Sequence, residues 1–252
     1  MMGFYNLSKE DRKKKVKQIQ QKLLNHLQGK QTNDDIPYFS DEDTFIRKAA
    51  YLAIGKIFNQ HESLLKPILQ LLEKSFTMKD TRVRQTAINA AGEIGLKKFE
   101  LVESFFDKGL FDDHHSVRNA VIGSIKKMGE KNPSPVLAWS KKYLHHPDTE
   151  IRREICHGIE LRGRTHPQDI LPLLIELQND TTARVRNTLI HVIGQISYKK
   201  GCLEIVISHL KKWENKELVG KAVVEIIEVH ERYKDFAFLT QKEAQKYISK
   251  NL

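Results

Sequence analysis

Apolar residues recur in a helical pattern around five arginines, each of which follows an isoleucine or a valine. Counted from the arginine, the apolar positions are −1, +3 and +7, which form one stripe along an α-helix. In one such segment the stripe around Arg84 is Val83, Ala87 and Ala91. The arginines are 37, 34, 34 and 34 residues apart: Arg47, Arg84, Arg118, Arg152 and Arg186. A fixed period in this range predicts a solenoid of helical repeats.

Each repeat is expected to hold two helices. The first is strongly apolar, most clearly over residues 64–72 and 170–177, and the second begins near the Ile/Val-Arg pair. Gly55, Gly92 and Gly194 stand at +8, a permissive position near the end of the second helix, and small residues at +6 favour close approach of a neighbouring helix. An aspartate that can accept backbone N–H bonds precedes each second helix: Asp43, Asp80, Asp113, Asp148 and Asp180.

The two ends of the chain depart from this pattern. A step of 34 residues beyond Arg186 reaches Gly220, where the apolar stripe continues without an arginine, as in a terminal cap. Ser8 opens a capping box before a basic amphipathic helix. We therefore expect residues 1–42 to form a basic helix and loop packed as a cap, 43–232 the repeats, and 233–252 a helical tail. No alternating strand pattern competes, so the fold is expected to be all-α.

The order of apolar helix, Asp80, Val83-Arg84 and Ala87 resembles the HEAT repeat, and the resemblance covers about residues 43–232. It implies a right-handed α-α superhelix of about six helical hairpins in which the second helices line the concave face. It also implies a structural ladder made by the five repeat arginines. We expect these arginines to bond to the aspartates and to carbonyl groups of the next repeat rather than to a ligand.

Composition narrows the setting and the class of partner. Two isolated cysteines form no disulfide framework, and the basic N-terminal segment lacks the apolar core of a secretory signal, so a cytoplasmic monomer is expected. No apolar run is long enough to span a membrane. The formal charge of +10 favours a partner with an acidic surface.

Pairs of basic residues follow the second helices at similar places in successive repeats. Stacking should align them as a basic edge that can follow a phosphate backbone. The alternative is that they solvate turns and complement helix C-termini. The predicted edge consists of Lys97, Lys98, Lys127, Lys131, Arg162, Arg164, Lys199 and Lys200.

Positions +1 and +5 of the second helices should point out from the concave face. From the second repeat onward they are polar and weakly cationic, and the first acidic residue among them is Glu225. A groove for apolar partner helices would expose Leu or Phe there. The alternative to a binding surface is ordinary solvated surface. The candidate binding residues are Asn119, Arg153, His157, Asn187 and His191.

The sequence has no recognisable catalytic or cofactor motif. Histidines gather at 114–115 and 145–146, but no His-x-x-x-His pair, zincin spacing or cysteine pair accompanies them, so no metal is expected. A phosphate-binding glycine loop and a serine nucleophile elbow are also absent, and Cys156 is interpreted as a packing residue. No catalytic residue, cofactor or small-molecule substrate is therefore predicted.

The run from Lys131 to Leu144, followed by Arg152 and Arg153, resembles a helix pair of the HEAT-like-repeat DNA alkylation-repair glycosylases. So does the run from residue 7 to 12. That family grips duplex DNA in its concave groove and excises cationic alkylpurines with aromatics and a carboxylate, and the resemblance implies that Arg152 or Arg153 contacts DNA. Alignment on Asn132 puts Arg118 where the family has its catalytic aspartate, and a shift of one repeat puts Arg84 there.

The sequence therefore predicts a non-catalytic scaffold that presents a polar, basic concave face and edge to a macromolecule, either protein or nucleic acid. The alternative is a DNA-binding relative of the alkylation-repair glycosylases that acts on alkylated purines. The two tryptophans, at 139 and 213, fall on predicted first helices, which should face away from the groove.

Overall fold

The computed structural model describes residues 3–30, 36 and 38–252, and among these residues it is helical without any strand. The all-α prediction is confirmed. The chain forms two compact units, residues 1–124 and 125–252, which are described separately. Most of the loop expected between residues 29 and 42 lies outside the described residues.

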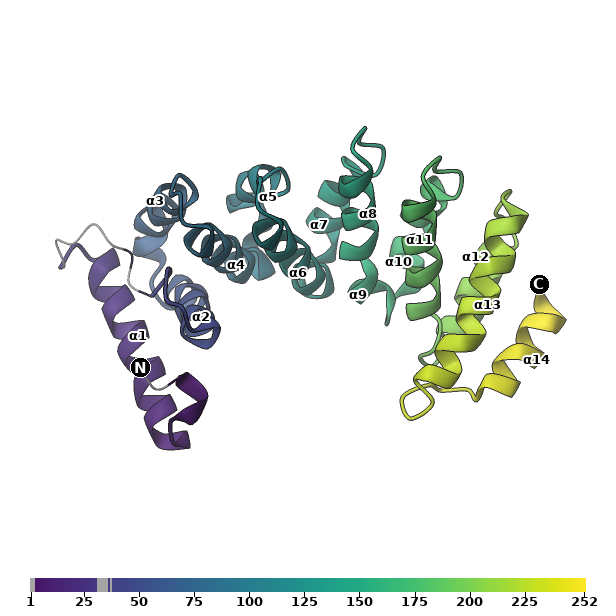
Figure 1. Cartoon of the computed structure of the whole chain (residues 1–252), viewed down its shortest axis with the longest axis horizontal. Coiled ribbons are helices and arrows are strands. Elements are labelled where there is room, and N and C mark those ends of the chain that lie inside the picture. Colours follow the sequence, from purple (N-terminus) through teal and green to yellow (C-terminus); the bar gives the residue numbers. More distant parts are fainter. Residues whose placement is uncertain (1–2, 31–35, 37) are drawn as a thin grey trace. The chain divides into compact units, whose positions relative to one another are not determined.

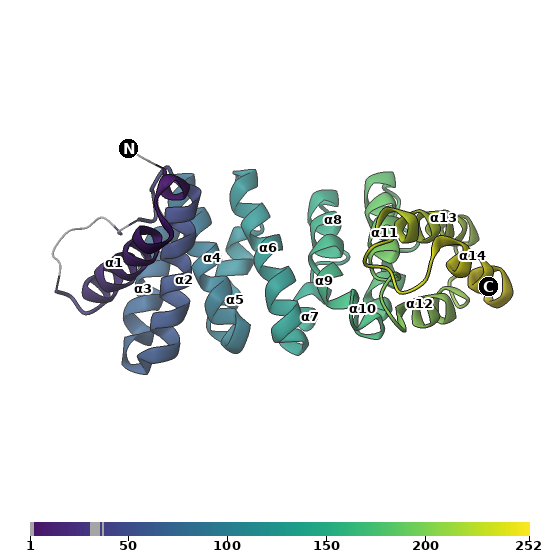
Figure 2. The same cartoon turned by 90° about the horizontal axis from the view of Figure 1, so that it is seen from below.

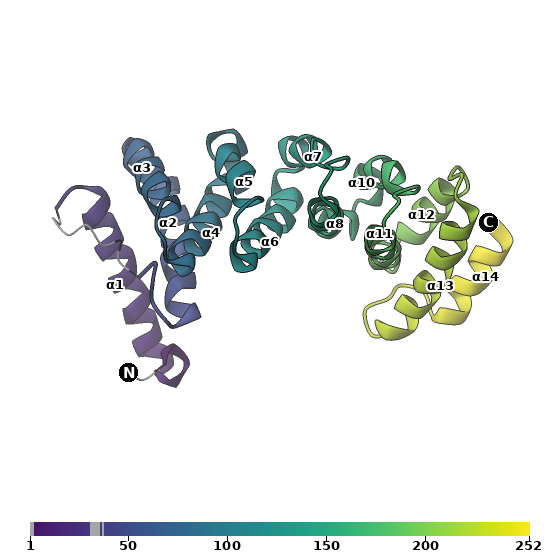
Figure 3. The same cartoon turned by 45° about the horizontal axis from the view of Figure 1, so that its top comes forward.

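The first unit alternates two rows of helices. The helices that carry the repeat arginines, with α4 packed on α2, form one row, and α3 and α5 lie in the other (Figures 1 and 3). Helix α1 is the basic N-terminal helix, and it packs on α2. The helices are α1 (Lys9–Leu27), α2 (Thr44–Gln60), α3 (Leu65–Phe76), α4 (Thr81–Lys98), α5 (Glu103–Gly109) and α6 (His115–Lys131), which continues into the second unit.

The second unit repeats this arrangement. Helices α8, α11 and α13 pack side by side in one row, and α7, α10 and α12 form the row behind them (Figure 2). Helix α14 packs on α12 and α13. The helices are α7 (Pro133–Lys141), α8 (Thr149–Gly158), α9 (Glu160–Gly163), α10 (Pro167–Leu174), α11 (Ala183–Gln195), α12 (Cys202–Leu210), α13 (Lys216–Arg232) and α14 (Gln241–Asn251).

An aspartate begins each of the five arginine-bearing helices by accepting the backbone N–H two residues further on. Asp43, Asp80 and Asp148 do so as the residue just before the helix, and Asp180 accepts from Thr182, which is itself the residue before α11. The third repeat differs from the sequence prediction. There Asp112, not Asp113, accepts from the backbone of His114.

Glycine at +8 was expected to relax the backbone near the helix end, but in the structure it makes room for the next helix. A Cβ added at Gly55 would lie 2.5 Å from the Cβ of Glu93, and one added at Gly194 would lie 2.6 Å from the Cγ of Glu225. Neither glycine has a positive φ. These residues therefore let consecutive arginine-bearing helices, α2 with α4 and α11 with α13, approach closely. We call the line of contact between consecutive arginine-bearing helices the seam.

The core between the rows consists mainly of Leu, Ile, Val and Ala, and each unit has its own. Trp139 and Trp213 are fully buried in the core of the second unit, at 1% and 0% exposure. None of the described helices has the combination of length and apolar character that crossing a membrane requires.

Candidate functional site

The five repeat arginines share one contact. Each donates from Nη1 to the backbone carbonyl six residues before it, in the turn that leads into its own helix. Four of them also reach the carbonyl five residues before. The sequence prediction of bonds to carbonyls of the next repeat was therefore wrong. The carbonyls belong to the same repeat, and the arginine fixes the turn that precedes its helix.

Two of these arginines also cross the seam to an aspartate. Arg84 donates from Nε and Nη2 to Asp112, at 2.7 and 3.0 Å, and Arg152 donates likewise to Asp180, at 2.6 and 3.1 Å. Burial disfavours ionisation of Asp180, but the hydrogen bond and charge of Arg152 outweigh it and lower the pKa of the carboxyl. The same balance lowers the pKa of Asp112 beside Arg84. In both cases the aspartate lies 28 residues after the arginine.

A groove of about 550 Å³ opens between α8 and α11, beside the Arg152–Asp180 pair in sequence but lined by other residues. Four of the predicted binding residues line it, and the fifth, Asn119, is exposed on α6 in the first unit. Sequence reasoning missed two lining residues, Arg184 and Thr188, which stand two residues to either side of Arg186. The groove, as we use the term below, is lined by Arg153, His157, Arg184, Asn187, Thr188 and His191.

Carboxylates hold the arginines of the groove. Glu150 accepts from Arg153 through one oxygen at 3.0 Å and from Arg184 through the other at 2.9 Å, so one side chain joins α8 to α11. Glu154 lies 3.5 Å from the far nitrogen of Arg153. These glutamates stand at −2 and +2 from Arg152, outside the +1 and +5 rows, and the rows therefore gave no sign of them.

Glu160 is the more deeply buried of two buried glutamates beside the groove, at 2% exposure against 7% for Glu154. It accepts from Arg164 through Oε1 at 2.9 Å, and its Oε2 lies 3.4 Å from Lys126 and 3.1 Å from His157. Burial opposes ionisation of Glu160, but the adjacent His157 and the charges of Lys126 and Arg164 outweigh it and lower the pKa of the carboxyl to about 2. Glu160 is therefore an anion at every physiological pH.

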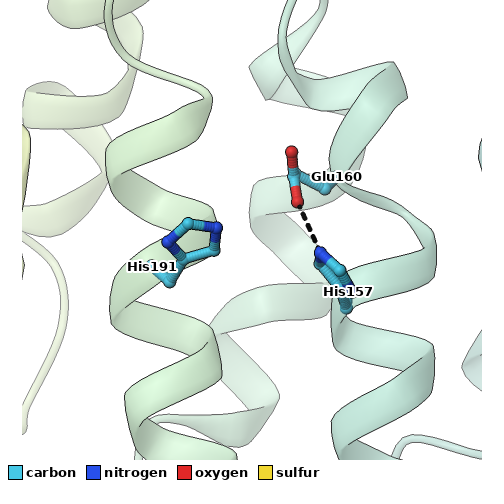
Figure 4. Close-up of side chains that lie close together, drawn as sticks. All are labelled: His157, Glu160 and His191. Atoms are coloured by element: carbon cyan, nitrogen blue, oxygen red, sulfur yellow. Dashed lines mark ion pairs between the residues drawn. The ribbon is translucent and has the colours of Figure 1, made fainter. Parts of the chain in front are cut away.

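His191 faces this cluster from the next helix. Its ring lies edge-on to that of His157, with the ring centres 6.3 Å apart, and Figure 4 shows one ring nitrogen of His191 directed toward His157 and Glu160. The other nitrogen, Nδ1, lies 3.5 Å from Oε1 of Glu225 on α13. Arg232 in turn contacts the same Glu225 oxygen at 3.2 Å.

The predicted basic edge is only partly built from exposed cations. Lys97 and Lys98 are exposed at the end of α4 in the first unit. In the second unit Lys127, Lys131, Lys199 and Lys200 are exposed. The two edge arginines need correction because both are held in ion pairs. Arg162 donates to Asp169 at 2.7 Å, and Arg164 is turned toward Glu160 and Gln195.

Both tryptophans and Cys156 are buried. Trp139 and Trp213 belong to the core, and burial raises the pKa of the Cys156 thiol, which keeps that side chain protonated. The groove itself is lined by hydrogen-bonding side chains without an aromatic ring other than imidazole.

Comparison with known proteins identifies the fold and leaves the family open. No protein-family profile and no curated protein matches the chain. Among solved structures, AlkD2 from Streptococcus mutans is 17% identical, with a TM-score of 0.54 over 81% of this chain and 97% of its own. The protein smu.31 from Streptococcus mutans UA159 is 18% identical, with a TM-score of 0.48 over 70% of this chain and 97% of its own. At 17% identity the likeness to AlkD2 shows a shared helical-repeat fold alone.

Proposed function

We propose that the protein is a non-catalytic helical-repeat scaffold whose groove binds the phosphate backbone of a nucleic acid. The observation that carries the proposal is the lining of the groove. Its six side chains are two arginines, two histidines, an asparagine and a threonine, all of which can donate hydrogen bonds. Such a surface suits an acceptor-rich anionic partner rather than an apolar helix.

The arginines are already oriented for this task. Glu150 holds Arg153 and Arg184 from opposite sides of the groove, so less side-chain freedom is lost when an anion binds. Arg184 remains 65% exposed, with its other guanidinium nitrogens available to a phosphate. The carboxylates also reduce the local positive charge, so binding at the groove should release few counterions from the nucleic acid. Attraction at longer range comes from the exposed lysines at 199 and 200 and from the overall charge of +10.

The resemblance to the alkylation-repair glycosylases supports DNA as the nucleic acid. It does not extend to catalysis, because the two tryptophans are buried and an arginine stands where that family has its catalytic aspartate. An acidic protein segment would present similar chemistry to the groove, and the experiment below separates it from nucleic acid.

The test is fluorescence anisotropy with a labelled DNA duplex at about 50 and about 200 mM salt. We expect binding that weakens with salt, and Arg184→Gln should weaken it several-fold and lower the salt dependence by about one ion. Lys246→Gln removes the same charge from an exposed position on α14, so it is the matched control and should keep most of the affinity. Absence of binding at low salt, or equal losses in both variants, would refute the nucleic-acid proposal.

Catalysis is tested separately by the release of bases from methylated duplex DNA. We expect no release above that of DNA incubated alone. Release by the natural chain that disappears in Arg153→Gln would overturn the non-catalytic part of the proposal.

A further inference from the structure

The +8 position of the repeat departs from its pattern at two places. Three repeats have glycine there, at 55, 92 and 194, where an added Cβ would lie within 2.6 Å of a side chain on the next arginine-bearing helix or on α13. The third and fourth repeats have Lys126 and Glu160 instead, and these two residues face each other. Close packing of the helices would be served by glycine at this position. Two opposite charges, 24% and 2% exposed, form a polar cluster instead, and packing alone does not require such a cluster.

The ammonium group of Lys126 marks a cation position in this cluster. Its nitrogen lies 2.9 Å from Nε2 of His157 and 3.4 Å from Oε2 of Glu160. An ammonium can only donate, so Nε2 of His157 faces it with a lone pair. The cation is therefore held by an imidazole lone pair and a carboxylate oxygen, which are also the donors that Zn²⁺ and similar ions accept.

His191 adds a third donor at the same place. One ligand atom from each of His157, Glu160 and His191 lies within 4.8 Å of the other two (Figure 4). Glu225 lies next to Nδ1 of His191 and can accept its proton, which leaves the lone pair on Nε2, the nitrogen that faces the cluster. A carboxylate behind a ligating histidine is the usual support for a metal ligand.

The rest of the surroundings fit a bound ion. Arg164 occupies Oε1 of Glu160 and leaves Oε2 toward the cluster, so the carboxylate is already oriented. His157 Nε2 and Glu160 Oε2 are 3.1 Å apart, close to the roughly 3.3 Å between neighbouring ligands of a tetrahedral ion with bonds of about 2.0–2.1 Å. His157 and His191 are 38% and 45% exposed, so both rings have room to close the remaining distance.

We propose that His157, Glu160 and His191 bind a divalent transition-metal ion such as Zn²⁺, and that the Lys126 ammonium occupies the same position in the metal-free protein. Lys126 is 24% exposed and has a flexible stem, so it can leave the cluster when the ion enters. Three protein ligands leave one tetrahedral position for water or an anionic oxygen. Two of the three, His157 and His191, also line the groove. The sequence analysis placed His157 and His191 in one row but missed Glu160, which lies outside the +1 and +5 positions, and it predicted no metal.

The test is titration of the full chain with ZnCl₂ by calorimetry, together with the visible absorption of bound Co²⁺, in the absence of nucleic acid. We expect one equivalent to bind, with Co²⁺ bands of a tetrahedral site. His157→Ala and His191→Ala should each abolish stoichiometric binding, and Glu225→Gln should weaken it about tenfold. Lys126→Met removes the competing ammonium and should tighten binding.

The matched control is His145→Ala. His145 also contacts a glutamate, Glu176, at 2.9 Å, but it lies outside the cluster and should not affect binding. Circular dichroism of each variant checks that it folds. The proposal fails if folded natural protein binds no ion, if His145→Ala removes binding as His157→Ala does, or if Lys126→Met weakens binding. Because the assay contains no nucleic acid, its outcome is independent of the proposed DNA binding.

Discussion

Arg152 and Arg153 are adjacent on α8, yet they have different partners and different roles. Arg152 lies in the seam at 12% exposure and bonds to two carbonyls of its own turn and to both oxygens of Asp180. Arg153 lines the groove at 24% exposure, between two glutamates on its own helix. The seam arginine has nearly all its donors satisfied by the fold, whereas the groove arginine is aimed at an open surface.

The difference teaches how a repeat separates architecture from recognition. The period places an arginine at the start of five helices, where each bonds to the turn before its helix, so its recurrence reports what the repeat architecture requires. The neighbouring position changes from repeat to repeat, as Lys48, Gln85, Asn119, Arg153 and Asn187, and so it is free to be chosen for a partner. In this protein the position that varies between repeats, next to the constant arginine, is therefore a better guide to function than the arginine itself.

The strongest test of this contrast is a pair of alanine substitutions. Arg152→Ala leaves Asp180, which is 6% exposed, without its partner, and we expect a loss of about 3 kcal/mol in the free energy of unfolding. Arg153→Ala removes one partner of Glu150, which is 38% exposed and keeps its other arginine partner, and a longer 3.5 Å contact with the buried Glu154. A smaller loss of about 1–2 kcal/mol is therefore expected. Urea denaturation followed by circular dichroism measures both.

A double substitution shows whether the charge or the packing matters in the seam. Arg152→Met with Asp180→Leu removes both charges together, and it should recover part of the loss caused by Arg152→Ala alone. Equal destabilisation by Arg152→Ala and Arg153→Ala would contradict the division into seam and groove.

The next effect is a dependence of stability on pH that arises beside the groove. The pKa of Glu160 is lowered to about 2 in the folded chain, below an unfolded value of about 4.3. Its contribution is therefore complete above the unfolded pKa and is lost as pH falls from about 5 toward about 2. We expect about 2 kcal/mol from this residue, so the urea midpoint of Glu160→Gln should fall less steeply with acid than that of the natural chain.

Asp180 sharpens the comparison because its pKa is also lowered, by Arg152 in the seam. Asp180→Asn should likewise flatten the acid limb. If Glu160→Gln leaves the acid dependence unchanged while Asp180→Asn flattens it, the charges beside the groove do not stabilise the fold.

Much of the fold and part of the groove were accessible from the sequence, because the arginines set the register of each second helix. That register brought Arg153, His157, Asn187 and His191 into one predicted row, and the structure places all four in one groove. The row also ends at Glu225, which contacts His191.

The side-chain partners were not accessible, for two physical reasons. Ion pairs across the seam join residues about one repeat apart, and their choice depends on rotamers that no periodicity encodes. Glu160 and Lys126 also stand at +8, where three other repeats have glycine. Helix α8 ends at Gly158, two residues before Glu160, so the apolar stripe gave no orientation for that side chain.

A smaller effect tests the close approach of helices in the seam of the first unit. Gly55→Ala places a Cβ against the Cβ of Glu93, which cannot move without its helix, so a loss of about 1–2 kcal/mol is expected. Gly220→Ala is the matched control in α13, where an added Cβ meets nothing within 4 Å. That change should stabilise the chain by about 0.5–1 kcal/mol, since alanine favours a helix more than glycine does. If both variants lose free energy of unfolding, the close approach of neighbouring helices does not explain why glycine occupies these positions.

Arg184→Gln should change stability the least of all these variants, although it should clearly weaken DNA binding. Arg184→Gln breaks one ion pair between side chains that are 65% and 38% exposed, and such pairs contribute about 0.5 kcal/mol or less. The same substitution should weaken DNA binding several-fold, because it removes the most exposed guanidinium of the groove. Thermal unfolding and anisotropy on one preparation measure the two effects together. If Arg184→Gln unfolds at a much lower temperature than the natural chain, Arg184 stabilises the fold as Arg152 does. The distinction between arginines that hold the fold and arginines that are available to bind a partner would then fail at Arg184, the most exposed arginine of the groove.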